Sequence, residues 1–161
     1  MTTRKIFGTQ YDDTILVTQS DFSIVTSSTK AKKPATEVYN TSDFSIAVFA
    51  GDGKDKVYMI GDSSDAVDGG SGDDLILGMA GNDTLSGDRD DTMIGGTGSD
   101  LFSIVTDGTP PAGTGVVRVD DFRVGEDDVE LFWNGTGDVT VQLRAVDGGV
   151  MVSGNGTDLI F

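Results

Sequence analysis

The sequence predicts a single-domain, all-β protein, and two patterns carry this prediction. From Ala50 to Ser103 a motif recurs about every nine residues, with glycines placed ahead of one aspartate and one apolar residue. In several segments outside this array, apolar and polar residues alternate, as they do in half-buried strands. With 161 residues, the chain is long enough for one domain with a hydrophobic core.

Six copies of the motif follow one another, and the clearest copy covers residues 69–77. The pattern is Gly-Gly-x-Gly-x-Asp-x-U-x, in which U is an apolar residue. The glycines permit backbone angles with positive φ, so each copy can turn sharply and direct its carbonyls inward. The last three residues then form a minimal strand with one side chain facing the core. The aspartate adds a hard carboxylate oxygen to every turn.

This motif resembles the RTX nonapeptide repeat of secreted bacterial proteins. The resemblance implies a calcium-binding parallel β-roll, flanked here by β caps. Two copies make one coil of such a roll, so turns on the same side lie two copies apart. The expected files of stacked aspartates are Asp55, Asp74 and Asp91 on one side, and Asp65, Asp83 and Asp100 on the other.

A file of stacked carboxylates needs a cation. Two unit charges ~4 Å apart repel by roughly 4 kcal/mol at an effective dielectric near 20. Carboxylates and carbonyls in a flexible loop suit Ca²⁺ better than Mg²⁺, which requires a stricter octahedron. We therefore predict several calcium ions as cofactors, with the candidate ligands Asp55, Asp65, Gly70, Gly72, Asp74, Gly81, Asp83, Asp91, Gly96, Gly98 and Asp100. The alternative, that the aspartates only cap tight turns, is disfavoured by the regular period.

The copies differ in regularity. Ser63 stands where the pattern has its fourth-position glycine, Met79 stands at a second-position glycine, and the copy that contains Asp91 is one residue short. These departures weaken the predicted sites at Asp65 and Asp91. The copy around Asp74 keeps all its glycines and predicts the soundest site.

Three segments organise the chain: an N-terminal cap over residues 1–49, the calcium-binding roll over residues 50–103, and a C-terminal β cap over residues 104–161. Stacked repeats need covered ends because an open roll leaves strand edges and an apolar face uncovered. The N-terminal segment contains a degenerate copy with Asp12 and Asp13. These two residues either bind a further calcium ion or, as we favour, are solvated turn residues, because the flanking glycines are missing.

Alternating Phe and Ile residues in segments 20–25, 42–48 and 99–105 predict strands that extend the same sheets. Residues 116–131 resemble the stretch after the repeats in serralysin-type proteases and in alginate-epimerase R-modules. That resemblance implies closure of the roll by antiparallel strands. The acidic residues within 120–128 favour a loop over a pair of catalytic carboxylates, since the sequence shows no nucleophile or apolar pocket beside them.

Further strands are predicted over residues 139–143 and 150–152. The chain ends in Asp158 followed by three apolar residues, which resembles the uncleaved export signal of type I secreted proteins. The first ten residues contain no apolar core of a signal peptide. We therefore expect a bacterial protein exported by a type I (ABC) exporter. The alternative is that the last residues only complete a cap strand.

Composition excludes several functions. The chain has no cysteine and no histidine, which excludes Cys/His zinc sites, thiol nucleophiles and Ser-His-Asp triads. Its formal net charge of −16 disfavours nucleic acid and anionic membranes as partners and favours cations. No apolar run approaches the ~20 residues of a membrane span.

The predicted function is that of a secreted, calcium-binding RTX protein that folds on extracellular Ca²⁺ and acts as a non-catalytic adhesion, structural or binding protein. A polysaccharide or a cell-surface component is the candidate partner. The alternative is a carbohydrate-binding R-module of a polysaccharide-modifying enzyme, such as a mannuronan C5-epimerase. Trp133 then offers a sugar-stacking surface, although packing in the core or cap is favoured for it. An enzyme is the least favoured class, because only 49 residues precede the array.

Overall fold

The computed structural model describes residues 4–18, 24–26, 35–37, 45–106, 115–133, 141–146, 149–154 and 157–160. All regular elements in these ranges are β-strands. Within the same ranges, no helix has the length and apolar character needed to span a membrane.

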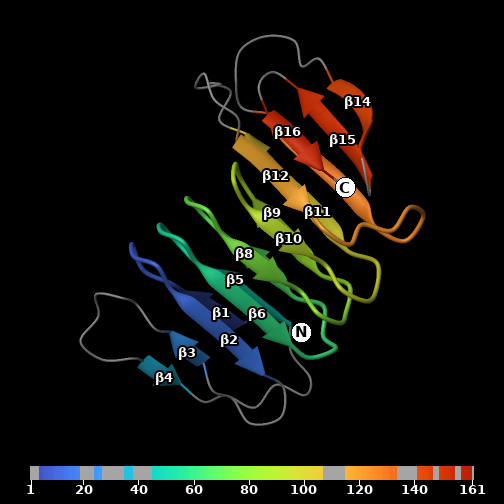
Figure 1. The fold of residues 1–161 in the computed structure, drawn as a ribbon. Coiled ribbons are helices and arrows are strands. Elements are labelled where there is room, and N and C mark those ends of the chain that lie inside the picture. Colours follow the sequence, from blue (N-terminus) through green and yellow to red (C-terminus); the bar gives the residue numbers. More distant parts are fainter. Residues whose placement is uncertain are drawn as a thin grey trace.

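Two mainly parallel sheets make up the protein (Figure 1). The six-stranded sheet has, in spatial order, β1 (Arg4–Phe7), β5 (Ile46–Phe49), β7 (Ala66–Asp68), β9 (Thr84–Gly87), β11 (Leu101–Thr106) and β13 (Asp128–Trp133). The eight-stranded sheet has β14 (Val141–Val146), β15 (Gly149–Gly154), β16 (Thr157–Ile160), β12 (Gly115–Val119), β10 (Thr92–Ile94), β8 (Leu75–Leu77), β6 (Lys56–Ile60) and β2 (Thr14–Thr18). A separate antiparallel pair consists of β3 (Ile24–Thr26) and β4 (Ala35–Glu37).

The chain alternates between the two large sheets from β5 to β13, so each coil uses one strand of each sheet. Strands two steps apart in sequence pair in parallel, as β6 pairs with β8 and β7 pairs with β9. Two copies of the motif therefore make one coil. The prediction of an all-β parallel β-roll is confirmed by this topology.

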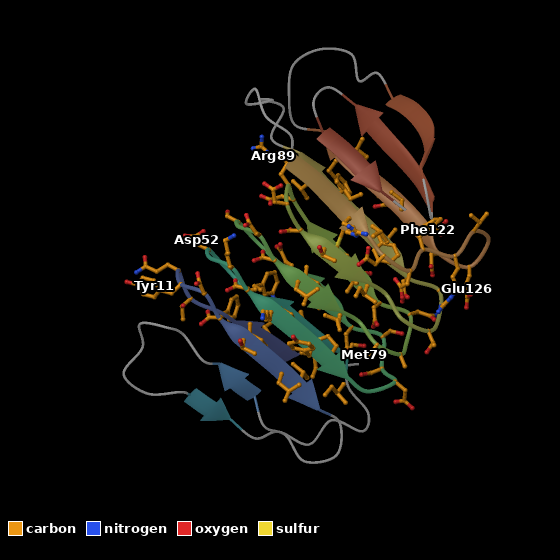
Figure 2. All side chains as sticks on the ribbon, in the orientation of Figure 1. Tyr11, Asp52, Met79, Arg89, Phe122 and Glu126 are labelled. Carbon is orange, nitrogen blue, oxygen red and sulfur yellow. The ribbon has the colours of Figure 1, made fainter. Side chains whose placement is uncertain are left out.

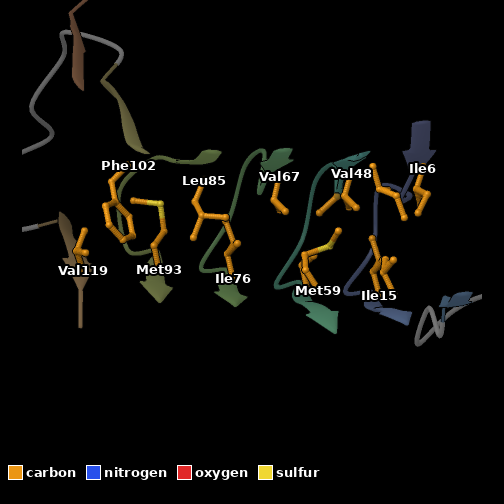
Figure 3. Close-up of a cluster of buried hydrophobic side chains, with 14 of the residues drawn as sticks. Ile6, Ile15, Val48, Met59, Val67, Ile76, Leu85, Met93, Phe102 and Val119 are labelled. Atoms are coloured by element: carbon orange, nitrogen blue, oxygen red, sulfur yellow. The ribbon is translucent and has the colours of Figure 1, made fainter. Parts of the chain in front are cut away.

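The hydrophobic core lies between the two sheets. Figure 3 shows its side chains in two facing rows, one from each sheet. The six-stranded sheet contributes Ile6, Val48, Val67, Leu85 and Phe102, and the eight-stranded sheet contributes Ile15, Met59, Ile76, Met93 and Val119. Parallel in-register pairing stacks the apolar position of each copy on that of the next coil. Each strand from β7 to β10 therefore places one fully buried apolar side chain in the core.

Parallel pairing extends beyond residues 50–103. At the N-terminal end, β1 pairs with β5 and β2 pairs with β6. At the other end, β12 pairs with β10 and β13 pairs with β11, also in parallel. Antiparallel closure by residues 116–131 was therefore wrong, because Val119 and Val129 continue the two apolar rows in register with Met93 and Phe102. Antiparallel pairing in this sheet is confined to β14, β15 and β16.

The alternating Phe/Ile segments divide between two outcomes. The strands β5 and β11 lie in the six-stranded sheet, as expected. The strand β3 does not extend that sheet, because it pairs only with β4 in a hairpin between β2 and β5. The predicted strands near residues 141 and 150 form as β14 and β15.

Two glycines with positive φ allow a matched test of the packing between coils. Gly70 has φ 88°, and a Cβ there would lie 2.0 Å from the carbonyl oxygen of Gly51 in the neighbouring coil. Gly125 has φ 85°, and no atom lies within 4 Å of a Cβ placed on it. We expect Gly125→Ala to cost about 1–2 kcal/mol of stability through the backbone alone, and Gly70→Ala to cost clearly more. Denaturant unfolding in saturating calcium measures both, and equal losses would contradict the close approach of the coils.

Candidate calcium site

The turns of the roll gather along its two edges. In Figure 2, Tyr11, Asp52 and Arg89 mark one edge, and Met79 and Glu126 mark the other. In eight of these turns, an aspartate stands directly before the strand that follows. The first ladder consists of Asp13, Asp55, Asp74 and Asp91, and the second ladder consists of Asp65, Asp83, Asp100 and Asp127. These eight residues are the buried polar side chains among the residues that the structure describes.

Hydrogen bonds connect the rungs of both ladders in the same way. The backbone N–H of Asp55 donates to Oδ1 of Asp74 at 2.8 Å, and Asp74 donates likewise to Asp91. On the other edge, the N–H of Asp83 donates to Oδ1 of Asp100 at 2.9 Å. The six aspartates of the predicted files therefore stack as expected. One oxygen of each carboxylate is used in holding the coils together.

Asp13 and Asp127 extend the ladders by one rung each. Asp13 is 2% exposed and its N–H donates to Asp55, so the prediction that it is a solvated turn residue was wrong. Asp12 is exposed, as predicted. Asp127 is buried and accepts the N–H of Asp100 at 3.0 Å, which the prediction of an acidic loop did not include. Both residues keep the Asp-x-U end of the motif, which is the signal that identifies them without the glycines.

The inner aspartates of both ladders have an unsatisfied oxygen. The Oδ2 atoms of these residues are buried and have no hydrogen-bond partner; the residues are Asp55, Asp74, Asp83 and Asp100. Their side chains are at most 3% exposed. A buried carboxylate oxygen without a partner is strongly destabilising unless a cation or a proton compensates it. These oxygens therefore point to a ligand.

Glycines leave room beside these oxygens. A Cβ on Gly69 would lie 2.8 Å from Oδ2 of Asp74, and one on Gly95 would lie 2.3 Å from Oδ2 of Asp100. Gly78 has the same relation to Asp83, at 2.6 Å. The first glycine of these copies thus keeps the space around the carboxylate open.

The predicted glycine ligands lie where consecutive turns touch. A Cβ on Gly72 would lie 1.6 Å from the carbonyl oxygen of Gly53, and one on Gly98 would lie 1.8 Å from that of Gly81. Gly70 and Gly96 make similar approaches to the turns beside them. Among the described residues, no three acidic side chains form a metal-binding cluster. The turns do offer carboxylate oxygens together with backbone carbonyls, a donor set that suits Ca²⁺.

Burial dominates the electrostatics of the ladders. It raises the pKa of Asp55 to about 6 and the pKa values of Asp74 and Asp83 to about 7, with neighbouring carboxylates adding to the shift. Burial raises the pKa of Asp91 to about 8. Without a cation, the folded state therefore binds protons more strongly than an unfolded chain, in which aspartate titrates near ~3.9.

This shift predicts the pH dependence of the calcium-free protein. A carboxyl group whose pKa is raised on folding stabilises the fold below its unfolded pKa, and this stabilisation is lost as the pH rises through the folded value. In calcium-depleted buffer, we therefore expect circular dichroism to show more β-structure at pH 5 than at pH 8. Asp74→Asn should reduce this difference, whereas Glu130→Gln, at an exposed position outside the ladders, should preserve it. Stability that increases from pH 5 to pH 8 would contradict the raised pKa values.

The comparison with known protein families agrees with this geometry. The family model for the RTX calcium-binding nonapeptide repeat, which comprises four copies, matches residues 60–90 and 86–103. Among solved structures, the extracellular lipase LipA from Serratia marcescens is similar at 13% identity and a TM-score of 0.27; the match covers 99% of this chain and 37% of the lipase chain. No curated protein matches the chain. Residues 60–103 therefore contain RTX calcium-binding nonapeptide repeats, and these repeats form middle coils of a parallel β-roll.

Proposed function

We propose that this chain is a secreted bacterial protein whose roll folds when it meets extracellular calcium, and that it then acts as a non-catalytic adhesion, structural or binding protein. The observation that supports the calcium-dependent step is the row of buried carboxylate oxygens without a protein partner. A role outside the cell fits the abundance of calcium there, and RTX repeat proteins are typically secreted bacterial proteins.

Calcium couples export to folding in this proposal. Inside the cell calcium is scarce, the stacked carboxylates repel one another and the chain stays unfolded. Outside, calcium bridges the turns, and its binding free energy becomes folding free energy. Affinities of extracellular calcium modules are weak, at ~10⁻⁴–10⁻³ M, which suits a switch between these two environments.

The export route in this proposal is a type I (ABC) exporter that reads the C-terminal residues. The acidic residue followed by three apolar residues supports this assignment. The same residues also have a structural position, because β16 pairs in parallel with β12 and antiparallel with β15. The two roles need to be separated by experiment.

A carbohydrate-binding role has one observation in its favour. Phe7 and Phe49 are exposed on the outer face of the six-stranded sheet, and their rings stack with centroids 5.2 Å apart. Exposed aromatic rings can pack against the apolar faces of sugars. The side chain of Trp133 lies outside the described residues. The net charge of −16 opposes binding of polyanions such as alginate, so binding of neutral and anionic polysaccharides by wild type and Phe49→Ala distinguishes this role.

Circular dichroism tests the central step. We expect little β-structure in chelator at pH 7.5 and a gain of β-structure as calcium reaches millimolar concentrations, because the unsatisfied carboxylates then acquire a cation. Magnesium at the same concentration serves as the control and should be a poor substitute. A fully folded spectrum in chelator would sink the proposal.

Removal of residues 158–161 tests the export route in cells that co-express a type I exporter. If these residues are the signal, secretion is lost while the calcium midpoint of the purified chain stays unchanged. If they serve the cap, the deletion lowers stability by burial loss, at ~1.5–3 kcal/mol for each large apolar side chain that was buried. Undiminished secretion would refute the signal.

A further inference from the structure

We propose that each ladder is terminated at both ends by hydrogen-bond donors of the chain itself, which take the place of the metal ion. Calcium then binds only through the inner aspartates, Asp55 and Asp74 in the first ladder and Asp83 and Asp100 in the second. This inference rests on the calcium binding of the proposed function. It assigns different roles to aspartates that look alike in the sequence.

The ends of the first ladder are satisfied within their own loops. At one end, Oδ2 of Asp13 accepts the backbone N–H of Thr9 at 2.6 Å. At the other end, Oδ2 of Asp91 accepts the N–H of Asp88 at 2.7 Å, while its Oδ1 accepts the N–H of Asp74. Only Oδ1 of Asp13 stays without a partner, and it is the oxygen that a preceding rung would use. The oxygen that faces the ion in an inner rung is thus occupied at both ends.

The ends of the second ladder use different donors to the same effect. At one end, the hydroxyl of Ser63 lies 3.3 Å from both oxygens of Asp65. At the other end, Oδ2 of Asp127 accepts the backbone N–H of Arg123 at 2.7 Å. The guanidinium of Arg123 also donates to the carbonyl oxygen of Gly96, so a protein cation occupies a turn carbonyl at this end.

The sequence stops each ladder where apolar residues begin. Strand register places Ile46 one coil before Asp65, and its N–H donates to Oδ1 of that carboxylate at 2.8 Å. In the same way, Val117 occupies the position one coil after Asp91. Both side chains are buried, at 2% and 0% exposed. Neither can supply a carboxylate to a further ion.

A carboxylate whose two oxygens both accept hydrogen bonds is stabilised less by a metal ion than a carboxylate with a buried free oxygen. In this proposal, the irregular turns near Ser63 and before Asp91 supply the donors that end the two ladders. The short turn before Asp91 brings the N–H of Asp88 to the carboxylate, with Asp90 at φ 73°. The length of the calcium-binding part is therefore set by these loops.

A series of isosteric substitutions measures which rungs bind the metal. Calcium stoichiometry is determined by equilibrium dialysis at saturating calcium for Asp74→Asn, Asp83→Asn, Asp65→Asn and Asp91→Asn. The two inner variants should each bind at least one ion fewer than the wild type, and the two outer variants should bind the wild-type number. Loss of ions in the outer variants to the same extent as in the inner ones overturns the inference.

An inner variant that fails to fold would lose calcium for that reason alone. A variant that gains a site avoids this difficulty. Ser63→Gly removes the donor hydroxyl and restores the fourth-position glycine, so one oxygen of Asp65 loses its partner. We expect one additional calcium ion per chain. The control is Ser71→Gly, at an exposed position inside an intact turn, which should leave the stoichiometry unchanged. An unchanged stoichiometry in Ser63→Gly contradicts the inference, whereas a wild type that binds no calcium contradicts the proposed function itself.

Discussion

Buried carboxylates stack along the two edges of the roll, and this stacking explains both the glycines of the turns and the calcium binding of the repeats. Each coil places an aspartate against the backbone of the coil before it, as Asp74 does against Asp55. This contact joins the coils, but it also buries negative charge in a chain whose net charge is already −16. The inner rungs keep a free oxygen after this bond is made. Calcium bound by the repeats compensates this buried negative charge.

The positions of the glycines follow from the same close stacking of the coils. Because the coils lie close together, a side chain at Gly70 or Gly72 would collide with the carbonyls of the neighbouring turn. At Gly69 a side chain would enter the space beside the free oxygen of Asp74. The core determines fewer positions of the repeat, since in-register stacking brings apolar side chains such as Ile76 and Met93 together. Most residues of the motif are therefore determined by the turns rather than by the core.

The ends of the roll have a different chemistry from its middle. Proteins built of stacked repeats require atypical terminal units, because a terminal coil has a neighbour on one side only. Here the outer aspartates find donors in their own loops, among them the hydroxyl of Ser63 and the N–H of Arg123. In our proposal the middle of the roll responds to calcium, and the ends limit how far that response extends. Such a division would let calcium control folding while the end loops set the length of the calcium-binding part.

The all-β class, the two-copy coil and the two files of aspartates could be predicted from the repeat, because a nearly regular period brings equivalent residues to the same edge. It predicted the intact copies best, and Asp13 and Asp127 were missed because their turns form without the full set of glycines. The direction of β12 and β13 also depended on strand register, which local residues do not specify. Which carboxylate oxygens remain free could not be predicted in this way, because it depends on whether a donor such as Ser63 or Thr9 reaches the carboxylate in the folded chain.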